Sequence, residues 1–191
     1  KSAKYRLSFD ELFLMHLSAL ERKDTWKKRV ASHPFSITEF KTYIEKFWDQ
    51  LPFELTNAQK RAVKDIFGDL ARNVPMNRLL EGDVGSGKTV VSAIAMYLAH
   101  LNGFQSVLMA PTEILAQQHY KTIGDLLSPL GVSVGLATGS KKLKSTARTF
   151  CLSTTHYYPL SLFRIVGKRQ FCRIHDISLG IFIKGNSWIF R

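Results

Sequence analysis

A phosphate-binding pattern with a strand before it and a helix after it limits the fold of this chain more than any other feature. Residues 82–89 read Gly-Asp-Val-Gly-Ser-Gly-Lys-Thr, which fits the pattern G-x-x-x-x-G-K-[ST]. The run 78–80 before the loop predicts a short buried strand, and the apolar run 90–98 after it predicts a helix. A Gly-rich surface turn would not need both flanks, so the sequence predicts an α/β fold with a phosphate-binding loop.

The residue types in this loop suit a nucleoside triphosphate. Glycines let the backbone turn tightly so that its N–H groups point at phosphate oxygens, and the start of the next helix adds a positive potential. We expect Lys88 to reach the β- and γ-phosphates and Thr89 to hold Mg²⁺, so both are candidate catalytic residues. The candidate cofactor-binding residues of the loop are Gly82, Asp83, Val84, Gly85, Ser86, Gly87, Lys88 and Thr89.

Helical and strand patterns alternate along the chain. Three helical patterns precede the loop, at residues 7–30, 37–48 and 57–72. We expect Ser36, with Glu39 three residues later, to cap the second of these helices, and Thr56 to cap the third. From the loop region onward the predicted elements are strand 77–81, helix 88–101, strand 106–110, helix 112–127 and strand 132–137. This alternation predicts a doubly wound parallel sheet, in which ligands bind outside the carboxyl ends of the strands.

The positive charge of the chain is concentrated at one end. The formal net charge is +12 over 191 residues. Residues 141–191 hold 10 Lys and Arg against one acid, which gives +9, whereas residues 1–140 hold 17 against 14, which gives +3. The basic excess therefore says little about the loop. It does leave open an alternative to an enzyme, a non-catalytic nucleotide- or nucleic-acid-binding module with a basic tail.

The chain shows no pattern of a secreted or membrane protein. It has no secretory signal and no uncharged stretch of transmembrane length, and Cys151 and Cys172 lack metal-ligand spacing. We expect a cytoplasmic protein without a membrane partner. Because the first residue is lysine rather than methionine, we also expect a fragment of a longer product.

A glutamine upstream of the loop is a candidate for base recognition. The amide of Gln59 can match both the donor and the acceptor on the edge of an adenine, and Phe53 is a candidate to pack on the base. A surface glutamine is the alternative interpretation, and it would be preferred if Gln59 stood alone.

A second segment follows the predicted strand 106–110. Residues Pro111, Thr112 and Glu113 open the next helix, where Thr112 and the first N–H groups can bind a nucleic-acid phosphate. Thr112 is also the predicted N-cap of this helix, and an ordinary capped helix with an acidic first turn is the alternative to a nucleic-acid contact.

These motifs together resemble the RecG family of bacterial ATP-dependent DNA helicases, which belong to superfamily 2. Transcription-repair coupling translocases share the Met-x-Arg-Leu-Leu run and the loop, but they usually have Tyr where Ser86 stands and Thr where Glu113 stands, so both residues favour RecG. The matching runs lie in the family's order between residues 6 and 144: Phe-Asp-Glu-Leu-Phe at 9–13, Pro-Phe-Glu-Leu-Thr at 52–56, Pro-Met-Asn-Arg-Leu-Leu at 75–80, the loop at 82–89, Ala-Pro-Thr-Glu-Ile-Leu-Ala at 110–116 and Thr-Gly-Ser at 138–140.

The resemblance implies a RecA-like P-loop sheet, incomplete here and preceded by a helical connector, with ATP and Mg²⁺ as cofactors. It makes Gln59 the adenine-reading residue. The whole enzyme would couple ATP hydrolysis to translocation on duplex DNA and remodel branched DNA, such as stalled forks and Holliday junctions, in repair and recombination. We expect a monomer. The residues that the resemblance places near DNA are Pro111, Thr112, Glu113, Thr138, Gly139 and Ser140.

The resemblance also divides the chain into three parts. Residues 1–50 would connect to an upstream DNA-binding domain, residues 51–144 would form the N-terminal part of the ATP-binding domain, and residues 145–191 would form a basic tail that does not match. The family's Asp-Glu-x-His box, which supplies acids to the Mg²⁺ site, does not occur in the sequence, so we expect this chain alone to be inactive. A frameshifted reading frame would explain the tail, and a divergent native insert is the alternative.

Overall fold

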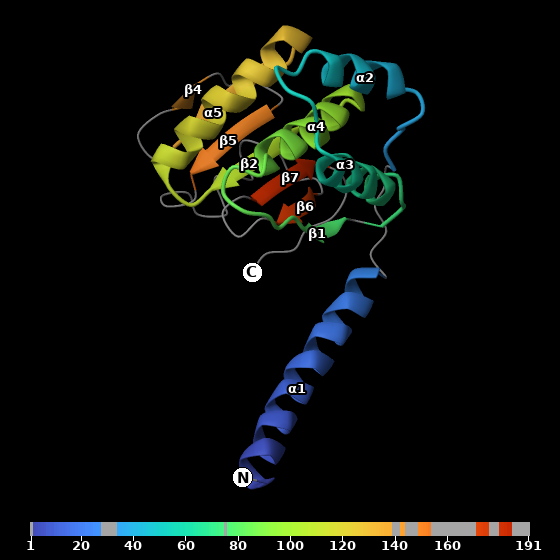
Figure 1. The fold of residues 1–191 in the computed structure, drawn as a ribbon, viewed down its shortest axis with the longest axis vertical. Coiled ribbons are helices and arrows are strands. Elements are labelled where there is room, and N and C mark those ends of the chain that lie inside the picture. Colours follow the sequence, from blue (N-terminus) through green and yellow to red (C-terminus); the bar gives the residue numbers. More distant parts are fainter. Residues whose placement is uncertain are drawn as a thin grey trace.

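The strands that the structure describes form one mixed β-sheet (Figure 1). The computed structural model describes residues 2–27, 34–74, 76–138, 142–143, 149–153, 171–175 and 180–184. Within these residues the sheet has seven strands in the order β1-β6-β7-β2-β5-β3-β4. The strands are β1 (Asn77–Leu79), β2 (Ser106–Ala110), β3 (Val134–Ala137), β4 (Lys142–Leu143), β5 (Thr149–Ser153), β6 (Phe171–His175) and β7 (Gly180–Lys184).

The pairing of these strands is only partly the parallel arrangement that we predicted. The pairs β1–β6, β2–β5 and β3–β5 are parallel, whereas β2–β7, β6–β7 and β3–β4 are antiparallel. A parallel pair needs a crossover of about a dozen residues, and the connections from β3 to β4 and from β6 to β7 are much shorter than that. Short connections therefore impose antiparallel pairing on β3–β4 and on β6–β7. Strands β5, β6 and β7 come from the residues that we separated as a tail, so that segment contributes to the sheet.

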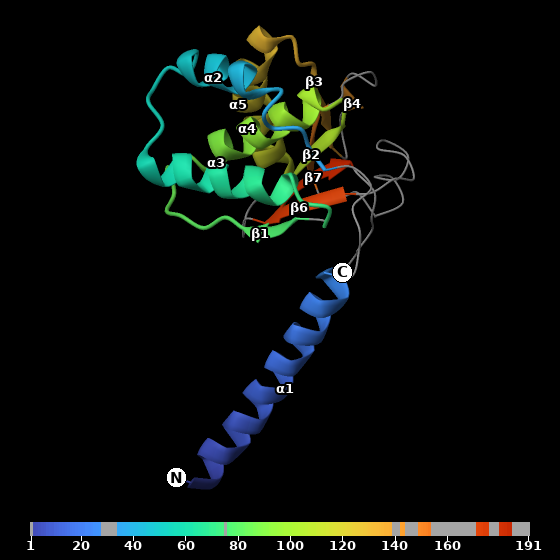
Figure 2. The same cartoon turned by 90° about the vertical axis from the view of Figure 1, so that its right-hand side faces the viewer.

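Five α-helices and one short 3₁₀ helix accompany the sheet in the described part of the chain. Helix α4 lies between α3 and α5 on one face of the sheet, and α2 packs over α4 (Figure 1, Figure 2). The helices are α1 (Ser2–Lys27), α2 (Lys41–Asp49), α3 (Asn57–Leu70), α4 (Lys88–Leu101), α5 (Glu113–Leu127) and η1 (Ser128–Leu130). The bounds predicted for α4 and β2 are confirmed. The second helical layer of a doubly wound sheet stays a prediction.

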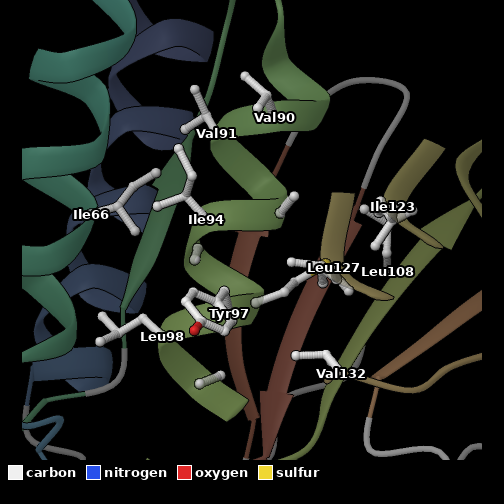
Figure 3. Packing of buried hydrophobic residues seen from close by; sticks show 14 of the residues in the cluster. Ile66, Val90, Val91, Ile94, Tyr97, Leu98, Leu108, Ile123, Leu127 and Val132 are labelled. Atoms are coloured by element: carbon white, nitrogen blue, oxygen red, sulfur yellow. The ribbon is translucent and has the colours of Figure 1, made fainter. Parts of the chain in front are cut away.

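Helix α4 is the centre of the hydrophobic core. Every residue from 90 to 99 is buried, and the sequence there is apolar on all sides apart from Ser92. A helix that is apolar all round must be covered all round. Figure 3 shows how this is achieved: Ile66 of α3 packs on one side of α4, and Leu108 of β2 with Leu127 of α5 packs on another. The helix that follows the phosphate loop is thus held rigidly in place.

The segment before α3 belongs to this core rather than to a separate connector. The backbone N–H of Phe35 donates to the carbonyl of Leu70 at 3.0 Å, and the ring of Phe35 stacks on Phe104 with centroids 4.9 Å apart. In α2, Phe47 is 1% exposed and meets Tyr97 edge to face. Residues from 35 onward therefore pack with the α/β body, and the division of the chain at residue 50 stays a prediction.

The predicted cap of α2 is wrong. The helix begins at Lys41 after Phe40, with no side-chain cap, rather than after Ser36. The backbone of Ser36 is used elsewhere: its N–H donates to Asn102 Oδ1 at 2.8 Å, and its carbonyl accepts from Asn102 Nδ2 at 3.3 Å. These two bonds hold the chain extended on the end of α4, so the helix starts one turn later.

Helix α1 stands apart from the α/β body in both views (Figure 1, Figure 2). Its apolar side chains are exposed, including Leu12, Phe13, Leu14 and Met15. Four consecutive apolar residues cannot share one helix face, since each residue turns by about 100°. The packing of this helix on a neighbouring domain stays a prediction. None of the helices that the structure describes is both long and apolar enough to cross a membrane.

Candidate functional site

The phosphate loop connects β1 to α4 at the carboxyl edge of the sheet. Two of its glycines have a left-handed backbone, Gly85 with φ +82° and Gly87 with φ +81°. These conformations strain any residue that carries a Cβ. Gly87 is a fixed glycine of the pattern, whereas Gly85 stands at one of its variable positions. Within the loop, the N–H of Ser86 donates to the carbonyl of Asp83 at 3.1 Å. Residues 82–86 are exposed, so the loop presents its backbone to solvent.

Lys88 lies across the loop that precedes it. Its Nζ donates to the carbonyl of Gly82 at 2.8 Å and to the carbonyl of Asp83 at 3.0 Å. These two bonds link the end of the loop back to its beginning, so the ammonium of Lys88 lies within the loop. An ammonium has three N–H groups and carries a full positive charge, so this position suits an anion bound by the loop.

The first turn of α4 completes the anion site. Gly87 is the N-cap residue, and its carbonyl accepts from the N–H groups of Val90 and Val91 at 3.0 and 3.3 Å. The preceding N–H groups of a helix have no partner within the helix, so they and the helix dipole favour a phosphate. Thr89 lies half-buried in this turn. The residues present therefore fit a triphosphate.

Among the predicted site residues, only Thr89 is a candidate ligand of Mg²⁺. The described part of the chain has no group of three or more His, Cys, Asp or Glu side chains that would hold a metal ion. Thr89 offers a hydroxyl beside the loop, and Mg²⁺ usually takes phosphate oxygens and waters as its other ligands. A cation at this site would therefore depend on bound nucleotide.

Gln59 is joined to the phosphate loop. Its Nε2 donates to the carbonyl of Ser86 at 2.8 Å, and its Oε1 accepts from the N–H of Thr56 at 2.8 Å. The hydroxyl of Thr56 accepts from the N–H of Gln59 at 3.3 Å, so the two residues form the capping box of α3. A Cβ on Gly87 would collide with Gln59 Nε2. The structure thus brings Gln59 to the loop and also uses it as a cap, while its role in reading adenine stays a prediction. Phe53, in the segment before α3, is 48% exposed, which leaves much of its ring accessible.

The carboxyl ends of β1, β2 and β3 lie at the same edge of the sheet. Strand β1 runs parallel to β6, and two antiparallel steps through β7 restore that direction in β2. Pro111, Thr112 and Glu113 follow β2 at this edge, and Pro111 and Thr112 are exposed. The hydroxyl of Thr112 accepts from the N–H of Leu115 at 3.3 Å and so caps α5. The capped-helix alternative therefore holds for Thr112, and any role in binding nucleic acid is additional.

The third predicted nucleic-acid segment has a different environment. Thr138 follows β3 and is 1% exposed, so its side chain does not reach the surface. This burial weighs against a direct contact between the Thr138 side chain and DNA. Gly139 and Ser140, which were predicted with it, lie outside the described residues.

An ion-pair cluster beside the loop was missed in the sequence. Arg78, in the middle of β1, donates from Nε and Nη2 to Asp69 Oδ2, each at 2.7 Å. Its Nη1 lies 3.5 Å from Asp65 Oδ2. The hydrogen bond to Asp69, opposed by burial, raises the pKa of the Arg78 guanidinium. The available signal was the spacing of the two aspartates, since residues four apart share a helix face.

Comparison with known proteins gives a consistent picture. The model of the family described as "DEAD/DEAH box helicase" matches residues 56–178. The ATP-dependent DNA helicase RecG of Aquifex aeolicus is 47% identical over 135 residues, which cover 71% of this chain and 17% of that protein. RecG of Synechocystis is 44% identical over 158 residues, which cover 83% of this chain and 19% of that protein. The chain thus spans about a fifth of the length of these curated relatives.

Solved structures agree with these matches. A structure of RecG bound to a three-way DNA junction superposes with a TM-score of 0.68 at 36% identity, covering 78% of this chain and 21% of that one. A hypothetical ATP-dependent RNA helicase from Sulfolobus tokodaii has a TM-score of 0.50 at 20% identity, covering 65% and 37%, which shows the fold alone. The match to the DEAD/DEAH box helicase model continues to residue 178, beyond residue 144, where the runs that resemble RecG end.

Proposed function

Because the chain belongs to the DEAD/DEAH box helicase family, we propose that it is part of the first motor domain of a RecG-like helicase and binds ATP at residues 82–89. The resemblance to RecG that the sequence predicted is confirmed by the curated relatives. One observation carries the proposal: the side chains of Lys88 and Gln59 both bond to backbone carbonyls of the same loop. The residue proposed to bind phosphate, Lys88, and the residue proposed to bind the base, Gln59, therefore lie at the same loop.

We assign the roles of the site residues from their positions. The left-handed glycines shape the loop, and Lys88 with the first turn of α4 binds the β- and γ-phosphates. Thr89 would hold Mg²⁺ through its hydroxyl, and that ion would neutralise phosphate charge. Gln59 binds the adenine edge, and Phe53 packs on the base.

DNA is the proposed partner of the longer protein. A relative has been solved on a three-way DNA junction, and we infer that this chain's parent protein also acts on branched DNA, such as forks and Holliday junctions. Pro111, Thr112 and Glu113 are the proposed contacts, because they lie at the same sheet edge as the loop. A monomeric state and a cytoplasmic location are part of this proposal.

We propose that this chain alone binds ATP without efficient hydrolysis. The sequence contains no Asp-Glu-x-His box, and phosphoryl transfer to water needs acids that complete the Mg²⁺ site and a residue that orients the attacking water. The expected result of a turnover assay is therefore nucleotide binding with phosphate release near the uncatalysed background.

The test is equilibrium binding of a fluorescent ADP analogue to the full chain in Mg²⁺. We expect Lys88→Ala to weaken binding about tenfold or more, because it removes a charge-assisted contact to phosphate. The matched control is Lys121→Ala, which removes an exposed lysine from α5 and should leave binding within about twofold of the unmodified chain. Equal binding by the Lys88 variant and the control would exclude the proposed site.

A further inference from the structure

Helix α3 is attached at both ends to the chain segment that forms the phosphate loop. At its N-terminus, Gln59 Nε2 donates to the carbonyl of Ser86 inside the loop. At its C-terminus, Asp69 binds Arg78, which stands four residues before Gly82. The helix therefore spans from the strand that enters the loop to the loop itself.

The attachment at the C-terminal end is well formed and partly shielded from water. Both contacts from Arg78 to Asp69 measure 2.7 Å, and the two side chains are 34% and 17% exposed. Asp65, one helical turn earlier, adds a longer contact at 3.5 Å. Charge-assisted hydrogen bonds of this length are among the strong ones in proteins.

Strand β1 is short, and the apolar residues that flank it, Met76 and Leu80, pack on the core. It is three residues long and lies at the edge of the described sheet, paired with β6 on one side. Arg78 is its middle residue, so the guanidinium ties the strand to α3 just before the chain enters the loop.

We propose that Arg78 and Asp69 are positioning residues for the nucleotide site, and that they hold α3 at the angle from which Gln59 meets the adenine. This inference rests on the proposed ATP site. A 14-residue helix is about 21 Å long, so releasing one end lets the other end tilt about its contacts. A hydrogen bond is lost within a few tenths of an ångström beyond 3.2 Å, so a small tilt removes base recognition while the loop keeps the phosphates.

The consequence is specific to the base. Losing the Arg78–Asp69 pair should lower the preference for ATP over GTP, because the two nucleotides share the ribose and the triphosphate and differ in the base, whose edge Gln59 is proposed to bind. If the pair had a purely structural role, its loss would weaken the binding of ATP and of GTP by the same factor.

The experiment uses the full 191-residue chain and measures dissociation constants of ATP and GTP by competition with a fluorescent ADP analogue. We expect Arg78→Met and Asp69→Asn to reduce the ATP-over-GTP preference about fivefold, the value of one hydrogen bond, with GTP affinity changed less than about twofold. Arg78→Lys keeps the charge without the two-pronged contact and should give an intermediate preference; it serves if circular dichroism shows that Arg78→Met does not fold.

Arg72→Gln is the matched control. Arg72 lies 3.4 Å from Asp69 Oδ1 but is 73% exposed and does not belong to β1. This variant should keep the preference within about twofold. The positioning role is overturned if Arg78→Met and Asp69→Asn leave the ATP-over-GTP preference unchanged, or if Arg72→Gln reduces it equally. Either result leaves the proposed ATP site standing. A parent chain that binds neither nucleotide overturns the proposed ATP site and this inference with it.

Discussion

Gly87 shows how much of the site depends on a single missing side chain. Its backbone is left-handed, it caps α4, and the space where its Cβ would lie is filled by Gln59 Nε2. Gly85 has nearly the same φ but has no atom within 4 Å of the corresponding Cβ position. Substitutions at the two glycines can therefore distinguish the effect of backbone strain from the effect of losing the contact with Gln59.

At the residue scale we expect Gly87→Ala to be more harmful than Gly85→Ala. Both variants carry a left-handed alanine, which costs about 1 kcal/mol of unfolding free energy. Only Gly87→Ala also displaces Gln59, so it should weaken nucleotide binding at least about fivefold further. Urea unfolding and binding of a fluorescent ADP analogue measure the two effects. Equal losses of binding in the two variants would mean that the Gln59 contact is unimportant.

At the scale of single elements, two of three predicted helix caps are confirmed. Thr56 caps α3 and Thr112 caps α5, each through its hydroxyl. Both were predicted from a threonine directly before an apolar periodic run. Ser36 had the same local pattern, but Asn102 binds its backbone and the helix starts later. A cap is predictable only where no distant residue competes for the backbone.

The cap of α3 gives an element-scale prediction. Thr56→Ala should lower the free energy of unfolding by about 1 kcal/mol, because the N–H of Gln59 loses its acceptor. Thr56→Ser, which keeps the hydroxyl, is the control and should cost much less. Urea titrations of the three proteins measure this difference, and identical midpoints would show that the cap adds no stability.

At the scale of the whole molecule, the packed unit begins earlier than the motifs suggest. Phe35, Ile44 and Phe47 are buried in the same cluster as α4, whereas the described side chains of α1 are mostly exposed. None of the runs that resemble the family lies within residues 34–50, so they carry no information about which of these residues complete the core.

Two truncations test this boundary. We expect a chain that begins at residue 34 to unfold at nearly the urea concentration of the full chain, because it keeps every buried side chain of α2. A chain that begins at residue 51 should lose more than about 3 kcal/mol, the cost of truncating one buried phenylalanine. If both truncated chains unfold alike, residues 34–50 do not contribute to the core.

The sequence by itself determined the features that depend on neighbouring residues. The loop glycines, the caps at Thr56 and Thr112, and the runs that form α4 and β2 each act within a few positions of the chain. Their conformational preferences are local, so a pattern in the sequence is enough to predict them.

Only the tertiary structure decided which distant groups meet. It bonds Gln59 to Ser86 across 27 positions, pairs Arg78 with Asp69, and uses Asn102 to hold Ser36. It also buries Thr138 and turns β7 antiparallel to β2. The physical reason is that these outcomes depend on how helices and strands pack and on how short the connections between them are. No local preference of the individual residues contains that information.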